Sequence, residues 1–208
     1  MEEPLEHIVY SKNVIEFVTV AKEFCTFIEG CEHYSRTDFV TVATRIIPLI
    51  YIKAAVLPKI EVELDEPIEK TVDEIVYEQV QASVAFKLGR FNDYLEVFTA
   101  DMQRSDTPII AFIAEDIADI YQDLKDFISA YRIGAVEIMN DALAVVQQDF
   151  EMYWGQRIVN TLRALHAVLY GEEDLEEEEG EETLQKERKT DNWFVSRMQK
   201  DWQEEQED

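Results

Sequence analysis

The sequence predicts an all-α fold: a bundle of five to six helices, followed by an acidic linker and a short C-terminal amphipathic helix. The 208 residues include only six glycines and five prolines, too few for a β-sandwich or barrel with a turn about every 8 to 12 residues. Hydrophobic residues make up 47% of the chain, enough for a packed core. Along residues 1–170 they recur mainly at steps of three and four, which is the period of a helix face. We therefore expect an all-helical bundle domain over 1–170.

The first two helices are predicted from apolar periodicity and from their end signals. One covers 13–29 and stops at Gly30, because glycine commonly ends helices. The next begins at Ser35 or Thr37, either of which can cap a helix. Pro48 lies inside this second helix and is expected to kink it, since proline has no N–H to donate.

A connection and a third helix follow. Between Pro58 and Pro67 apolar and charged residues alternate, which predicts an extended segment able to form a short edge strand. Thr71 and Glu74 stand at the spacing of a capping box, in which each side chain accepts from a backbone N–H at the helix start. The third helix is expected to run from there to about Leu88.

The second half of the domain is predicted to hold two long helices. Residues 90–105 lack a sustained helical period but are rich in aromatics, so we expect this connection to pack against the bundle. Thr107 and Pro108 read as an N-cap and a first helical residue. The last helix follows Gly134 and is interrupted by Gly155. Glycine costs a helix about 1 kcal/mol relative to alanine, so a close helix crossing is expected there.

Residues 171–208 differ in composition from the rest. Nine of the eleven residues from 172 to 182 are acidic, a density that resists compaction and predicts a linker. Beyond the linker, large apolar residues return at helical spacing, and we expect an amphipathic helix that docks on its own domain or on another chain. Its apolar residues are Trp193, Phe194, Val195, Met198 and Trp202.

The formal net charge of −26 constrains the partners. A strongly acidic protein repels nucleic-acid phosphates and anionic membrane surfaces, so neither is an expected partner, whereas a basic protein partner suits it. The acidic start, residues 1–6, lacks the basic and apolar regions of a signal peptide, and we expect a cytoplasmic protein. Cys25 and Cys31 are too far apart for a CxxC pair and are expected as reduced thiols. The oligomeric state is left open.

One predicted helix carries a row of carboxylates opposite an apolar face. The simplest interpretation is a solvent-exposed face with no cofactor. The alternative is a metal site, because Mg²⁺ and Mn²⁺ prefer oxygen ligands. The row contains Glu115, Asp116, Asp119, Asp123 and Asp126, and the candidate metal ligands are the first four.

The last predicted helix carries one cluster of cationic and polar residues in an otherwise acidic protein. Arg157, Asn160, Arg163 and His166 can pair with the acidic row or neutralise a phosphate. The sequence contains no Glu-x-x-His pair, which argues against a di-iron bundle. It also contains no glycine-rich phosphate loop and no nucleophile elbow. Any enzymatic activity would therefore rest on carboxylates.

Two helical motifs resemble an uncharacterised bacterial domain-of-unknown-function family. Residues 115–125 read EDIADIYQDLK, and YWG (153–155) and LRALH (162–166) follow; the family carries a "DDLADIYRDLK" helix and an "HWG" plus "LRAL" helix. The resemblance covers about 89–169, and Tyr153 stands where many relatives have histidine. It implies an all-helical fold and importance for the residues that match: Asp116, Asp119, Tyr121, Asp123, Trp154, Gly155 and Arg163.

From these patterns we expect a non-enzymatic interaction or regulatory module. The alternative is a Mg²⁺- or Mn²⁺-dependent phosphohydrolase that acts on a nucleotide or a similar small phosphate, with Arg157 or Arg163 beside the phosphate. The candidate binding residues are Asp116, Asp119, Tyr121, Asp123, Trp154, Arg157, Arg163 and His166.

Overall fold

The computed structural model describes residues 7–96 and 109–176. It divides into two units, of which Met1–Leu175 holds all the described helices. The expected all-α bundle is confirmed, because six α-helices account for most of the described residues, and the sheet found among them has two short strands. The helices are α1 Lys12–Glu29, α2 Arg36–Ala55, α3 Glu74–Leu88, α4 Ile113–Tyr131, α5 Val136–Asp149 and α6 Gly155–Leu169. The expected C-terminal amphipathic helix lies outside the described residues.

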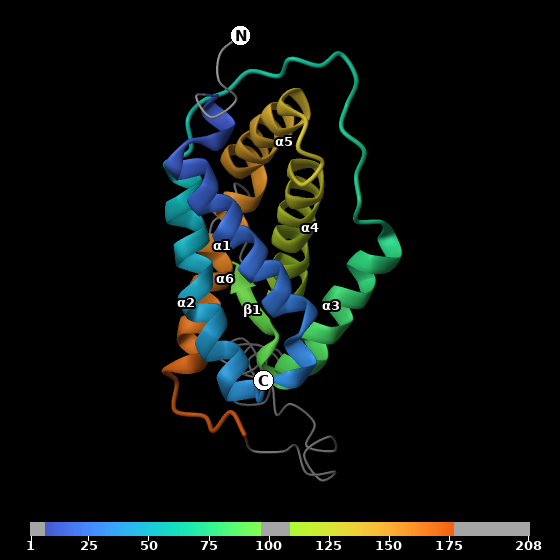
Figure 1. The fold of residues 1–208 in the computed structure, drawn as a ribbon. Helices are drawn as coiled ribbons and strands as arrows, with labels where there is room; N and C mark the ends of the chain where they lie inside the picture. The colour runs from blue at the N-terminus through green and yellow to red at the C-terminus, as the bar shows by residue number, and fades with distance from the viewer. Residues whose placement is uncertain (1–6, 97–108, 177–208) are drawn as a thin grey trace, which may run out of the picture. The chain divides into compact units, whose positions relative to one another are not determined.

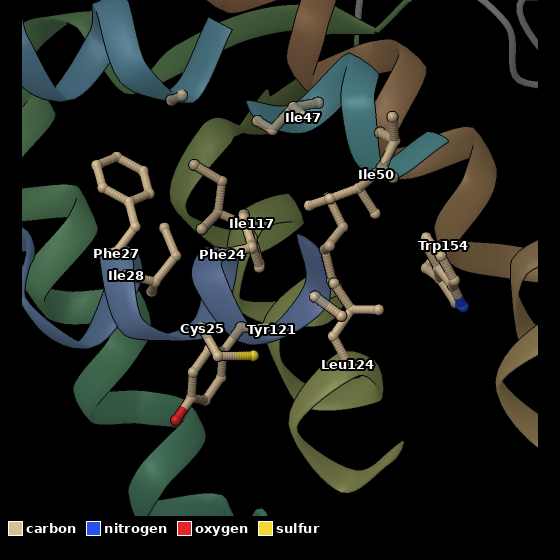
Figure 2. Close-up of a cluster of buried hydrophobic side chains, with 14 of the residues drawn as sticks. Phe24, Cys25, Phe27, Ile28, Ile47, Ile50, Ile117, Tyr121, Leu124 and Trp154 are labelled. Carbon is tan, nitrogen blue, oxygen red and sulfur yellow. The ribbon is translucent and has the colours of Figure 1, made fainter. Parts of the chain in front are cut away.

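Helix α4 is the centre of the bundle and packs against α1, α3, α5 and α6, while α2 packs against α1 and α6 (Figure 1). Figure 2 shows the core where α1, α2 and α4 meet, with Phe24, Ile47 and Ile117 pointing toward one another. These three side chains are fully buried. Each contributes roughly 1.5–3 kcal/mol through the removal of apolar surface from water.

The segment from Leu57 to Asp73, which we call the strap, is extended as expected but forms no strand. It crosses from α2 to α3 over one end of the bundle (Figure 1). Side chains of α5 satisfy its backbone: the two carboxylate oxygens of Asp141 accept from the N–H groups of Glu63 and Leu64 at 2.7 and 2.8 Å. Asn140 donates to the carbonyl of Glu61 at 2.8 Å.

The predicted capping box at Thr71 is wrong by two residues. Asp73 is the N-cap of α3, and its carboxylate accepts from the N–H of Val76 at 2.9 Å. The N–H groups of Thr71 and Val72 instead donate to one oxygen of Asp126 on α4, at 2.7 and 2.8 Å. The carboxylate on α4 therefore holds the end of the strap, and α3 starts after it.

The predicted helix start at Pro108 is also wrong. Residues 109–112 form strand β2 (Ile109–Phe112), which pairs antiparallel with β1 (Asp93–Glu96), and α4 begins at Ile113. The cap comes from a distant residue: Asn92 accepts from the N–H of Ile113 with its backbone carbonyl and from the N–H of Ala114 with its side chain. Local capping signals could not show this, because Asn92 lies about 20 residues upstream.

Helices α5 and α6 are joined by a π-helical segment, Phe150–Trp154, into one continuous helical stretch. The expected reason for Gly155, a close helix crossing, is wrong. The wider π turn brings the carbonyl oxygen of Phe150 to 2.5 Å from where a Cβ on Gly155 would lie, and the Phe150 ring to 3.0 Å. Glycine is therefore required by the π turn of its own helix.

The packed unit ends beyond the expected boundary at residue 170. Leu175 is buried in the core, and its carbonyl accepts from the Arg36 guanidinium at 2.9 Å. The first part of the predicted linker thus belongs to the packed unit. Among the described helices, none has the length and apolar character needed to cross a bilayer.

Candidate functional site

Asp116 lies in the first turn of α4 with 1% of its surface exposed, although the sequence favoured a solvated face. Three donors surround its carboxylate. Tyr94 of β1 donates to Oδ2 at 2.5 Å, Thr161 of α6 donates to the same oxygen at 3.3 Å, and Arg157 of α6 donates to Oδ1 at 3.0 Å. The exposed-face prediction fails here because α6 and β1 pack over this side of α4.

Asp119 lies one turn further along α4 and extends the same network. Its Oδ1 accepts from the hydroxyl of Tyr77 on α3 at 2.9 Å, and its Oδ2 accepts from the hydroxyl of Tyr153 at 2.6 Å. Arg157 lies 3.5 Å from Oδ2 and stacks 5.2 Å from the centre of the Tyr153 ring. The expected pairing of the last helix with the acidic row is therefore confirmed for Arg157.

The charge state of this network follows from its burial. Burial raises the pKa of Asp116 to about 6, while the Tyr94 hydrogen bond, the Arg157 charge and the Thr161 hydrogen bond oppose the rise. Burial, together with the hydrogen bond to Asp119, also raises the pKa of the Tyr77 hydroxyl. The phenols therefore stay protonated at neutral pH and act as donors. Because each carboxylate oxygen already accepts at least one hydrogen bond, this network ties together α3, α4, α6 and β1.

Two other predicted residues serve the core. The ring of Tyr121 is buried against α1 (Figure 2), and its hydroxyl donates to Glu29 at 2.9 Å. Trp154 is fully buried, and its indole N–H donates to the carbonyl of Val146 at 3.0 Å. Both side chains fill space between helices and satisfy their polar atoms internally.

The remaining predicted residues lie near or on the surface. Arg163 is exposed and donates to the carbonyl of Leu95 on β1 at 2.6 Å. His166 is exposed and contacts the tilted ring of Tyr170, with 4.7 Å between ring centres. Glu115 is exposed on α4. The structure therefore unites only Asp116, Asp119 and Arg157 among the predicted site residues.

Asp123 faces a separate cavity between α4, α5 and the strap, with a volume of about 170 Å³. Asp149 of α5 and Lys70 of the strap also line it, but no ion pair within 4.0 Å joins the described atoms of Lys70 to either carboxylate. Burial, reinforced by the charge of Asp149, raises the pKa of Asp123 to about 7, and Lys70 opposes this. The apolar wall includes Ile68, Phe127, Ala142 and Val146.

The region that matches known proteins contains all six α-helices. Residues 8–171 match the family described as "Domain of unknown function (DUF5063)". The chain belongs to this family. The crystal structure of protein BF1032 from Bacteroides fragilis, a structural genomics target, is similar with a TM-score of 0.72 and 45% sequence identity, over 80% of this chain and 98% of that one. No curated protein matched the chain. The resemblance to an uncharacterised family is thus confirmed.

The candidate metal ligands of this DUF5063 chain do not converge. Both oxygens of Asp116 and of Asp119 accept hydrogen bonds from protein donors, Glu115 is exposed, and Asp123 faces the cavity. Over 7–96 and 109–176, no three His, Cys, Asp or Glu side chains come together as a metal-binding group.

Five residues of the two sites were not among the candidates predicted from the sequence: Tyr77, Tyr94, Thr161, Lys70 and Asp149. Thr161 carried a usable signal, since it lies one helical turn after Arg157 and so shares its face. The other four carried none, because they reach the sites through the packing of other elements onto α4. Those contacts depend on where α3, α5, β1 and the strap lie against α4, which the sequence does not show.

Proposed function

We propose that this DUF5063 protein is a non-enzymatic interaction module that binds a basic segment of a protein partner at the Asp123 cavity. The observation that supports the proposal is the combination of two carboxylates, Asp123 and Asp149, with apolar walls. A lysine or arginine side chain has the matching form, because its aliphatic stem packs on apolar surface while its charged head meets the carboxylates.

The electrostatics of the cavity favour such a ligand. Asp149 raises the pKa of Asp123, and burial raises the pKa of Asp149 itself. A cation between the two carboxylates would relieve their repulsion and lower both pKa values. The exposed part of the strap adds long-range attraction through five further carboxylates: Glu61, Glu63, Asp65, Glu66 and Glu69.

Affinity capture from the native lysate tests the proposal. The full chain should retain a basic partner at low salt and release it as salt rises, because screening weakens attraction between exposed charges. The variant Asp123→Asn/Asp149→Asn should lose that partner. The matched control Glu23→Gln/Glu78→Gln removes two exposed carboxylates elsewhere and should keep it. Equal capture by both variants would contradict a role for the cavity.

If the protein were instead a Mg²⁺- or Mn²⁺-dependent phosphohydrolase, its melting temperature should depend on the metal. A metal that binds only the folded state raises the melting temperature. Melting scans with and without millimolar Mg²⁺ or Mn²⁺, combined with a phosphate-release assay on a nucleotide panel, separate the two functions. A metal-dependent rise in melting temperature together with phosphate release would contradict the interaction module and support the phosphohydrolase.

A further inference from the structure

The two edges of the two-stranded β1–β2 ribbon differ, because a side chain bonds to the β1 edge while the β2 edge is open among the described residues. The N–H of Ile113 donates to the carbonyl of Asn92. Since hydrogen-bonded and non-hydrogen-bonded pairs alternate in an antiparallel ladder, the Leu95–Ile110 pair turns its backbone groups away from the ribbon. On β1 the Arg163 guanidinium occupies the outward carbonyl of Leu95.

On β2 the outward groups are the N–H and carbonyl of Ile110 and the N–H of Phe112. Within 7–96 and 109–176, no residue hydrogen-bonds to the N–H or carbonyl of Ile110 or to the N–H of Phe112. The edge strand also lacks the charge or proline that usually protects an edge, because 109–112 reads IIAF. A ribbon of two strands is marginal by itself, and a third strand would stabilise it.

The side chains of the open edge are also apolar and exposed. Ile110 is 52% exposed, Phe112 44% and, across the ribbon, Leu95 49%. Because Leu95 and Ile110 are paired, they lie on one face of the ribbon, and Phe112 shares that face two residues on. An added strand would bury alternate apolar side chains against this face while its backbone pairs with β2.

The net charge of the chain indicates which kind of strand can pair with the edge of β2. A second copy would bring another net charge of −26 to an edge of four residues, and an edge this short buries far less than the roughly 1,200 Å² of a stable interface. A positively charged segment is attracted instead, and the exposed carboxylate of Glu115 lies three residues beyond Phe112.

We propose that the open edge of β2 binds an extended, positively charged segment of a protein partner as a third strand. The inference rests on the proposed function only for the sign of the partner's charge. It concerns a different surface from the Asp123 cavity, and it specifies the conformation of the bound segment: extended, with alternating apolar and basic residues.

The test uses the full chain and a fluorescein-labelled hexapeptide of alternating valine and lysine. Fluorescence anisotropy should show binding that Ile110→Lys weakens at least tenfold. The control Ile75→Lys places the same charge at an exposed apolar position on α3 and should change the dissociation constant less than threefold. Amide exchange of the unmodified protein should slow at least tenfold at Ile110 and Phe112 when the peptide is added.

Several results would overturn the proposal. Equal weakening by the two lysine variants would show attraction by charge alone, and an absence of binding would remove the site. Protection of the Ile110 amide that grows with protein concentration, without peptide, would assign the edge to a second copy. Peptide binding that Asp123→Asn/Asp149→Asn abolishes and Ile110→Lys leaves intact would keep the proposed function and place the segment at the cavity.

Discussion

Arg157 donates to Oδ1 of Asp116 across 3.0 Å and so joins α6 to α4 in the interior of the bundle. The two residues are 41 positions apart and come from two helices that both lie within the family match, residues 8–171. The carboxylate is almost completely buried while the guanidinium is about a quarter exposed. The pair therefore places a carboxylate in the core whose only ion-pair partner among the described residues is Arg157, beside the hydrogen bonds from Tyr94 and Thr161.

We expect Arg157→Met to lower the free energy of unfolding by roughly 3 kcal/mol, because it leaves a buried carboxylate without its cation. Urea denaturation at pH 7.5 measures the loss. Arg163→Met is the control, since it removes an exposed arginine that bonds only a backbone carbonyl, and it should cost about 1 kcal/mol or less. Similar losses for the two variants would contradict the structural role of the buried pair.

The raised pKa of Asp123 gives a pH-dependent prediction. The folded state binds this proton more tightly than the unfolded chain, so Asp123 lowers the free energy of unfolding as the pH rises from about 4 to about 7. Asp123→Asn should therefore stabilise the protein by at least ~1 kcal/mol at pH 8 and by clearly less at pH 4.5, where most of the decrease has not yet occurred.

Denaturation curves at the two pH values test this difference. Glu69→Gln serves as the control, because it removes an exposed carboxylate of the strap beside the same cavity. Its effect should be small at both pH values. A gain for Asp123→Asn that is equal at pH 4.5 and pH 8 would show that the stabilisation does not arise from the titration of Asp123.

The bundle core could be predicted from the sequence, because apolar residues at steps of three and four place α1, α2 and α4 without knowledge of their neighbours. The site could be predicted only in part. Asp116 and Arg157 were recognised, but which carboxylate is buried depends on where β1 and α6 pack. Asn92 shows the same limit, since it caps α4 from another element and leaves no local pattern.

Gly155→Ala should destabilise the protein by about 2–3 kcal/mol. The new methyl group would meet the Phe150 carbonyl and ring, and the π turn cannot make room without moving the packing of Phe150 against Trp154. Thermal denaturation measures the loss. Gly30→Ala is the control, because its methyl group would make only ordinary contacts. A Gly155→Ala variant as stable as the parent would show that the helix can adopt a regular α turn here.

Two truncations test the boundary of the folded unit. A chain ending at residue 176 should melt cooperatively, since it retains the buried Leu175 and its contact with Arg36. A chain ending at 170 loses both and should be less stable by about 2–3 kcal/mol. Calorimetry of the two chains decides between them. Equal stability of the two chains would support the boundary at residue 170 that the composition predicts. Aggregation of both chains would show that residues beyond 176 belong to the core.

The attachment of the strap has an evolutionary consequence. The strap is held by hydrogen bonds between its main-chain atoms and the side chains of Asp141, Asn140 and Asp126. These bonds do not depend on which side chains the strap carries at the bonded positions. The side chains of Glu61 and Glu63 are exposed, so substitutions there can change the charge of the strap's surface without changing its backbone path. Insertions and deletions would shift the anchored N–H groups out of register. Related proteins can therefore vary the charge of this face through the identity of the strap's residues, provided that the length of the strap stays constant.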